Sequence, residues 1–269
     1  MLSEGLYNKV YNTLRIAMAM CFIGHGSFGI ITKLIWCNYF AVFGIGHDAA
    51  YHLMPVVGCM DMLLGASMLV YPTKIVPAWL VVWGIITALL RPLSGEPFAE
   101  FIERSGNFGA PLALLILCGG SKNIGGWFTR IKPNLQPDQE TYKKIAFCLK
   151  ILVFLLLAGH GWLNLVEKKG LIQQYTNLGF SNPVQVAQIA GVAEIIFALL
   201  VLIKPIRPVL FALFIWKAGT ELFYPHYGLL EWIERGGSYG TLLALYFLTE
   251  KNLKAFIPQW PIVFRSITV

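Results

Sequence analysis

Two long apolar runs of this chain each carry a histidine between two glycines. The triplets are Gly24-His25-Gly26 and Gly159-His160-Gly161, and the two histidines lie 135 positions apart. The match continues downstream with two short deletions, up to the segments 100–109 and 231–240, which both begin Glu-x-x-Glu-Arg. Such self-similarity predicts two copies of one structural unit. Other aligned pairs are Gly58 with Gly191, Asp61 with Glu194, Trp83 with Trp216, Pro92 with Pro225 and Gly95 with Gly228.

The apolar runs place the chain in a membrane. Hydrophobic residues make up 57% of the sequence and charged residues 13%, where soluble domains have about 25% charged residues. Several runs approach the roughly 20 residues that cross a bilayer as a helix. The fold class predicted is all-α, a polytopic integral membrane protein with about eight transmembrane helices as two parallel four-helix repeats. The helices are expected over 13–35, 53–71, 76–90, 106–118, 144–166, 184–203 and 207–223, with one more from about 237.

The two repeats are expected over 1–120 and 143–269, joined by a basic linker over 121–142. The linker, the turns near Lys74 and Lys204, and the C-terminal tail are basic. The positive-inside tendency places these segments and both termini in the cytoplasm. The net charge of +7 is therefore a topology signal, and nucleic acid is not an expected partner. The five cysteines form no C-x-x-C pair, which argues against a disulfide framework or dithiol site.

Ionisable side chains within apolar helices are candidates for function, because each costs about 2.5–3.5 kcal/mol at the bilayer centre. Lys217 and Glu221 are spaced i,i+4, which makes the second half the richer predicted site. Lys217 could instead make a plain ion pair and extend outward to the interface. Helix rise places the two histidines in the outer part of their helices, and Asp61 and Glu194 about two turns in from the outer ends. The predicted pocket residues are His25, Asp61 and Arg91 in the first half, and His160, Glu194, Lys217 and Glu221 in the second.

The two Glu-x-x-Glu-Arg segments are expected in outer loops. Each segment either continues a helix into a buried face or lies as an amphipathic turn at the interface, with Phe101 and Trp232 toward lipid. The residues concerned are Glu100, Glu103, Arg104, Glu231, Glu234 and Arg235.

Several functions are compatible with these residues. A His–carboxylate pocket could bind an apolar molecule with a polar head, such as a quinone. His25 and His160 could ligate a b-type haem, or the repeats could build a small-molecule transporter. A His–Asp pair could also be only an interhelical hydrogen bond. No H-x-x-x-H or H-E-x-x-H spacing supports a metal site, and no hydrolase, phosphate-loop or dinucleotide signature is present.

The repeated unit resembles the DoxX-like family of small four-helix membrane proteins. The similarity lies in a glycine-rich first helix with flanking basic residues, and in a second helix that opens Gly-x-x-Asp/Glu. The resemblance implies a fused double unit, and an accessory or quinone-associated subunit of a membrane redox system, with other membrane or redox subunits as partners. A non-catalytic structural subunit of a larger complex is the alternative. The residues that carry the resemblance are Arg15, Gly24, Gly26, Gly29, Lys33, Gly58, Asp61, Gly65, Gly191 and Glu194.

Overall fold

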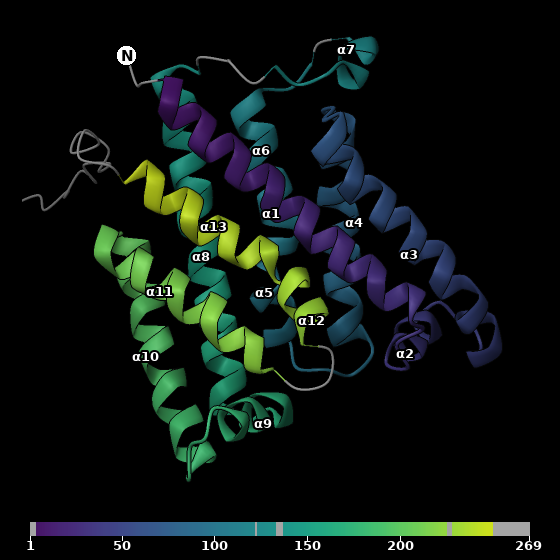
Figure 1. Ribbon diagram of the computed structural model, residues 1–269, viewed down its shortest axis with the longest axis vertical. Helices are drawn as coiled ribbons and strands as arrows, with labels where there is room; N and C mark the ends of the chain where they lie inside the picture. Colours follow the sequence, from purple (N-terminus) through teal and green to yellow (C-terminus); the bar gives the residue numbers. More distant parts are fainter. Residues whose placement is uncertain (1–3, 122, 133–136, 225–227, 250–269) are drawn as a thin grey trace, which may run out of the picture.

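The computed structural model describes residues 4–121, 123–132, 137–224 and 228–249, and this part of the chain is helical (Figure 1). The first half contains α1 (Glu4–Ile30), α2 (Trp36–Ala41), α3 (His47–Val70), α4 (Ile75–Leu93), α5 (Ala99–Glu103) and α6 (Ser105–Cys118). The linker contains α7 (Ile124–Phe128). The second half contains α8 (Gln139–Leu165), α9 (Lys169–Asn177), α10 (Pro183–Ile203), α11 (Arg207–Thr220), the 3-10 helix η1 (Glu221–Phe223), α12 (Leu229–Glu234) and α13 (Gly236–Leu248).

Five of these helices, α1, α3, α4, α8 and α10, are long and apolar enough to cross a membrane. Their outward faces are apolar: Leu63 of α3 is 71% exposed and Ile189 of α10 is 64% exposed. Large exposed apolar side chains suit contact with lipid. The helices α6, α11 and α13 have 14, 14 and 13 residues. The chain is therefore a helical membrane protein, and its all-α class is confirmed over the described residues.

Several helix ends differ from the predicted ones. The first helix begins at Glu4 and ends at Ile30, where Thr32 adopts a left-handed backbone with φ 53°. The segment 36–52, expected as a loop, contains α2 and the first turn of α3. Because α3 begins at His47, Asp61 lies near the middle of its helix, about four turns in. The prediction of about two turns was wrong. Pro225 and the basic C-terminal tail lie outside the described residues.

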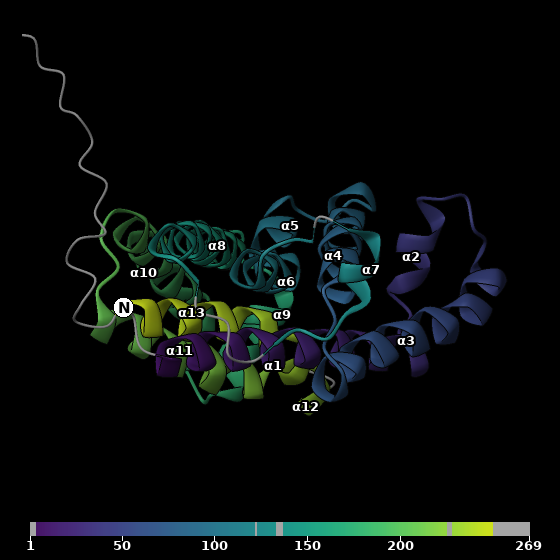
Figure 2. The same cartoon turned by 90° about the horizontal axis from the view of Figure 1, so that it is seen from above.

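The long helices form two layers, and each layer contains helices from both halves of the chain (Figure 2). One layer runs α3, α1, α13, α11 in order of contact, and the other runs α10, α8, α6, α4. The layers meet where α13 packs on α6 and α8, and where α1 packs on α6. The N-terminus of α1 and the linker helix α7 lie at one end, with α2 and α9 at the other (Figure 1). The halves are thus interlocked, and neither is a closed bundle.

Glycines allow the helices within and between the halves to approach closely. A Cβ atom on Gly26 of α1 would lie 2.5 Å from the carbonyl oxygen of Gly58 of α3. A Cβ atom on Gly161 of α8 would lie 2.8 Å from the carbonyl oxygen of Gly191 of α10. Small residues at such crossings let helix backbones come together in membranes. The second glycine of each Gly-His-Gly triplet therefore brings the histidine next to the helix that carries the acid.

Candidate functional site

Each histidine is hydrogen-bonded to the acid of its own half. His25 Nδ1 lies 2.7 Å from Asp61 Oδ2, and His160 Nδ1 lies 2.6 Å from Glu194 Oε2. In each pair the imidazole N–H donates to the carboxylate, which fixes the ring and leaves Nε2 for another partner. The structure therefore brings together the two pairs that the sequence pattern singled out.

The first glycine of each triplet faces the other half of the chain. A Cβ atom on Gly24 would collide with the backbone of Glu234 in α12, and one on Gly159 would collide with the backbone of Glu103 in α5. The two triplets thus hold three elements around each histidine: its own helix, the helix with the acid, and the short Glu-x-x-Glu-Arg helix of the other half.

The first half encloses a pocket with aromatic walls. The pocket has a cavity volume of about 80 Å³. His25 reaches this pocket, and its ring packs 4.7 Å from that of Trp36. The indole Nε1 of Trp83 donates to Asp61 Oδ1 at 2.7 Å, so both oxygens of Asp61 accept a hydrogen bond. The other aromatic wall residues are Tyr39, Phe40 and Phe43.

Polar groups reach the same pocket from α4, α5 and α12. Arg91 and Arg104 supply guanidinium groups, and Glu234 supplies a buried carboxylate. Arg91 bonds Glu96 at 3.2 Å, and Glu96 in turn accepts a hydrogen bond from Tyr39. The charged groups nearest the Glu234 carboxylate include Arg104, Lys33 and Arg91. The pocket therefore presents guanidinium groups, a carboxylate and a histidine to a ring-shaped guest.

The second half holds a closed cluster of charged side chains. Lys217 Nζ lies 3.8 Å from Glu194 and 3.6 Å from Glu221, and His160 Nε2 lies 3.9 Å from Glu221. These four side chains are each 1–3% exposed. Asn164 donates to Glu194 at 3.2 Å. The expectation that Lys217 extends outward to the interface is wrong, because its ammonium group is buried among carboxylates.

The two Glu-x-x-Glu-Arg segments are buried between the layers. All four glutamates are 1–5% exposed, and Arg104 and Arg235 are 7% exposed. Arg104 bonds Glu100 and Glu103 of its own segment, and Arg235 bonds Glu103 across the halves. The interpretation as amphipathic turns facing lipid is therefore wrong, and the alternative, a short helix directed into a buried face, describes α5 and α12.

Two lysines pair with glutamates of these segments across the halves. We call the paired residues the buried charged belt, and they are Lys33, Glu100, Glu103, Arg104, Lys168, Glu231 and Arg235. Lys33, just after α1, lies 2.7 Å from Glu231, and Lys168, just after α8, lies 2.6 Å from Glu100. The two lysines are 135 positions apart, the same offset as the histidines. This shared offset is a sequence signal from which the two cross-half pairs could have been predicted. Trp83, Trp36, Tyr39 and Asn164 carried no signal that assigned them to a site, since aromatic residues near helix ends also form interfacial belts.

The belt controls the ionisation of its glutamates. Burial raises the pKa of Glu100, but Arg104, Lys168 and Arg91 outweigh burial and lower that pKa from 4.5 to about 2. Burial also raises the pKa of Glu103, and the facing Arg235 and Arg104 bring it well below the usual range. Both carboxylates are therefore charged at neutral pH, as partners of buried arginines.

The pocket and the richer cluster are in different halves. The second half has more titratable groups, as the sequence predicted, yet the aromatic cavity lies in the first half. At the aligned positions the first half has Gly84 and Ala88 where the second has Lys217 and Glu221, and of the first pair Ala88 lines the pocket. His25 and His160 belong to separate clusters, so the geometry gives no support to one haem held between them.

Comparisons with known proteins identify no relative. No protein-family model matches the chain, and neither a curated protein nor a solved structure matches it.

Proposed function

We propose that this protein binds a quinone-type head group in the first-half pocket, as a quinone-associated or accessory subunit of a membrane redox system. The observation that carries the proposal is the lining of the pocket: its walls are aromatic, and the His25–Asp61 pair lies at its wall. Aromatic walls suit a flat ring, while the imidazole and the guanidinium groups suit its oxygens.

The proposal includes an architecture. Eight helices, α1, α3, α4, α6, α8, α10, α11 and α13, would form two parallel repeats of the DoxX-like type in a bacterial inner membrane, with both termini cytoplasmic. The recurrence of α1, α3, α4, α5 and α6 in the same order as α8, α10, α11, α12 and α13 supports the repeats. So does the contact of Gly106 with Gly237, which occupy the same place in the aligned segments. Residues that meet their own counterparts lie on a pseudo-two-fold axis.

The test is a binding titration on the full chain in lipid nanodiscs. Ubiquinone and menaquinone analogues with short tails are added, and quenching of tryptophan fluorescence is followed, since Trp36 and Trp83 line the pocket. Trp83→Phe removes the hydrogen bond to Asp61 and should weaken binding about tenfold. The matched control is Trp216→Phe, at the aligned position of the second half, which should leave the affinity unchanged.

Three outcomes are informative. Saturable binding that Trp83→Phe weakens and Trp216→Phe does not supports the pocket. Equal loss in both variants, or no saturable binding, contradicts it and favours a structural subunit. A visible haem absorption band in the purified protein, lost in His25→Ala, would instead support a haem protein.

A further inference from the structure

Four buried polar atoms in the second-half cluster lack a hydrogen-bond partner within the described part of the chain. They are His160 Nε2, Glu194 Oε1, Lys217 Nζ and Glu221 Oε2. Lys217 Nζ lies 3.8 Å from Glu194 Oε1 and 3.6 Å from the other oxygen of Glu221, Oε1, and His160 Nε2 lies 3.9 Å from that oxygen. These separations are within ion-pair range but too long for direct hydrogen bonds. Buried polar atoms without partners are rare and call for a specific explanation.

The corresponding acid of the first half does have hydrogen-bond partners for its oxygens. The acid at the equivalent position, Asp61, has both oxygens satisfied by His25 and Trp83. Glu194 has one oxygen satisfied, by His160 and Asn164, and its other oxygen faces Lys217. The second half thus has one acid, Glu221, and one base, Lys217, at positions where the first has only Ala88 and Gly84.

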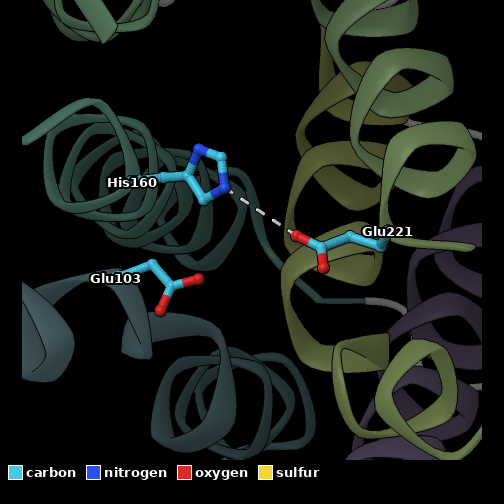
Figure 3. A group of neighbouring side chains, drawn as sticks. All are labelled: Glu103, His160 and Glu221. Atoms are coloured by element: carbon cyan, nitrogen blue, oxygen red, sulfur yellow. Dashed lines mark ion pairs between the residues drawn. The ribbon is translucent and has the colours of Figure 1, made fainter. Parts of the chain in front are cut away.

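A bound metal ion is one explanation, and the charges nearby argue against it. Glu103, His160 and Glu221 each offer a ligand atom within 4.8 Å of the others, and Figure 3 shows the imidazole of His160 directed at Glu221. However, Glu103 already accepts from Arg104 and Arg235, and Arg235 also lies 3.8 Å from Glu221. A divalent cation in this position would face these arginines and Lys217 at short range in a medium of low dielectric constant.

A proton adds one positive charge to the same groups, where a divalent metal ion would add two. We propose that the second-half cluster is a buried proton-transfer site, in which His160, Glu194, Lys217 and Glu221 share one exchangeable proton. In the transfer step, the Nε2–H bond of the His160 imidazolium breaks and an O–H bond forms on Glu221. The imidazole is left neutral and still donates from Nδ1 to Glu194. Lys217 stabilises the carboxylates when the proton is absent.

Other charged or titratable side chains face the cluster from neighbouring elements. They are Glu103, Tyr175, Arg235 and Tyr239. Arg235 and Glu103 also connect the cluster to Arg104 on the wall of the first-half pocket. This site does not depend on what occupies that pocket.

The test is infrared difference spectroscopy of the full chain in nanodiscs, titrated from acid to alkaline pH in H2O and in D2O. A carboxylic-acid C=O band that shifts in D2O is expected, with one exchangeable proton per chain. Glu221→Gln should remove this band. The matched control is Glu140→Gln, at an exposed glutamate of α8, which should leave it in place.

Two results would overturn the proposal. One is a wild-type spectrum in which no carboxylic-acid C=O band shifts in D2O, a result that needs no variant to fold. The other is a stoichiometric divalent metal in the purified protein whose removal by chelator unmasks the titration, since that would make the cluster a metal site.

Discussion

The ammonium group of Lys168 lies 2.6 Å from a carboxylate oxygen of Glu100, although the two residues belong to different halves of the chain. Lys33 and Glu231 make the corresponding pair in the opposite direction at 2.7 Å. Each lysine follows a histidine-bearing helix, and each glutamate belongs to a buried short helix of the other half. The two halves are therefore joined at the same level as the pocket and the second-half cluster, so assembly of the halves and formation of the sites are one process.

Lys168→Met should destabilise the protein. Removing the ammonium group leaves the buried Glu100 with fewer cationic partners, and loss of a charged hydrogen bond of this kind costs about 1–3 kcal/mol. The measurement is the free energy of unfolding in detergent. Lys144→Met is the control, because Lys144 and Glu140 form an exposed pair at 3.9 Å that should contribute less than about 1 kcal/mol. Equal effects of the two substitutions would argue against a structural role for the cross-half pair.

Gly159→Ala should also destabilise the protein, by about 1–3 kcal/mol, because the new methyl group would collide with the backbone of Glu103. Backbone atoms cannot move aside as a flexible side chain can. Gly219→Ala in α11 is the matched helical control, since no neighbouring atom lies within 4 Å of its added Cβ. That substitution should be neutral or stabilise the helix slightly. Thermal unfolding of both variants tests the pair, and an unchanged melting temperature for Gly159→Ala would contradict the packing.

Glu100 should make stability depend on pH in the acid range. Its folded-state pKa of about 2 lies below the ordinary 4.5. The folded state therefore binds this proton less readily, and the stabilisation is fully present above pH 4.5 and is lost as the pH falls toward 2. Glu100→Gln should lower the melting temperature at neutral pH, and the difference from wild type should shrink as the medium is acidified. A difference that stays constant over this range would show that the Glu100 charge contributes nothing.

Glu234→Gln should discriminate between the two redox forms of a pocket ligand. The Glu234 carboxylate lines the pocket and can accept a hydrogen bond from a quinol hydroxyl, whereas a quinone has only acceptors. The variant should therefore weaken quinol binding about tenfold and affect quinone binding less. Glu231→Gln is the control from the same helix, because Glu231 pairs with Lys33 and does not line the pocket. Equal weakening of both redox forms would contradict this role for Glu234.

Much of the local structure could be predicted from the sequence. Long apolar runs predicted helices in a membrane, because a chain in lipid must satisfy its backbone hydrogen bonds internally. The alignment of the halves singled out His25 with Asp61 and His160 with Glu194, and the structure shows both pairs hydrogen-bonded. These features follow from spacing along one chain, since helix periodicity and a repeated motif are local properties.

Other features depended on packing between segments far apart in the sequence. The sequence of the Glu-x-x-Glu-Arg segments is compatible with the membrane interface or with a buried face. Their burial depends on the partners Lys33 and Lys168, one from each half. The location of the cavity was decided in the same way. Trp36, Tyr39 and Trp83 come together around it from α2 and α4, and no spacing in the sequence indicates that meeting.

The sequence by itself determined that this chain is an all-helical membrane protein with a histidine and an acid in each half. The tertiary structure decided that the halves exchange contacts through a buried charged belt, and that the pocket with aromatic walls forms beside His25. The physical reason is that Trp36, Tyr39 and Trp83 meet around the first-half pocket, whereas Lys217 and Glu221 place buried charges in the second half at the positions of Gly84 and Ala88. Whether a space is filled and whether a buried charge has a partner both depend on the packed interior. These properties exist only once the helices have come together.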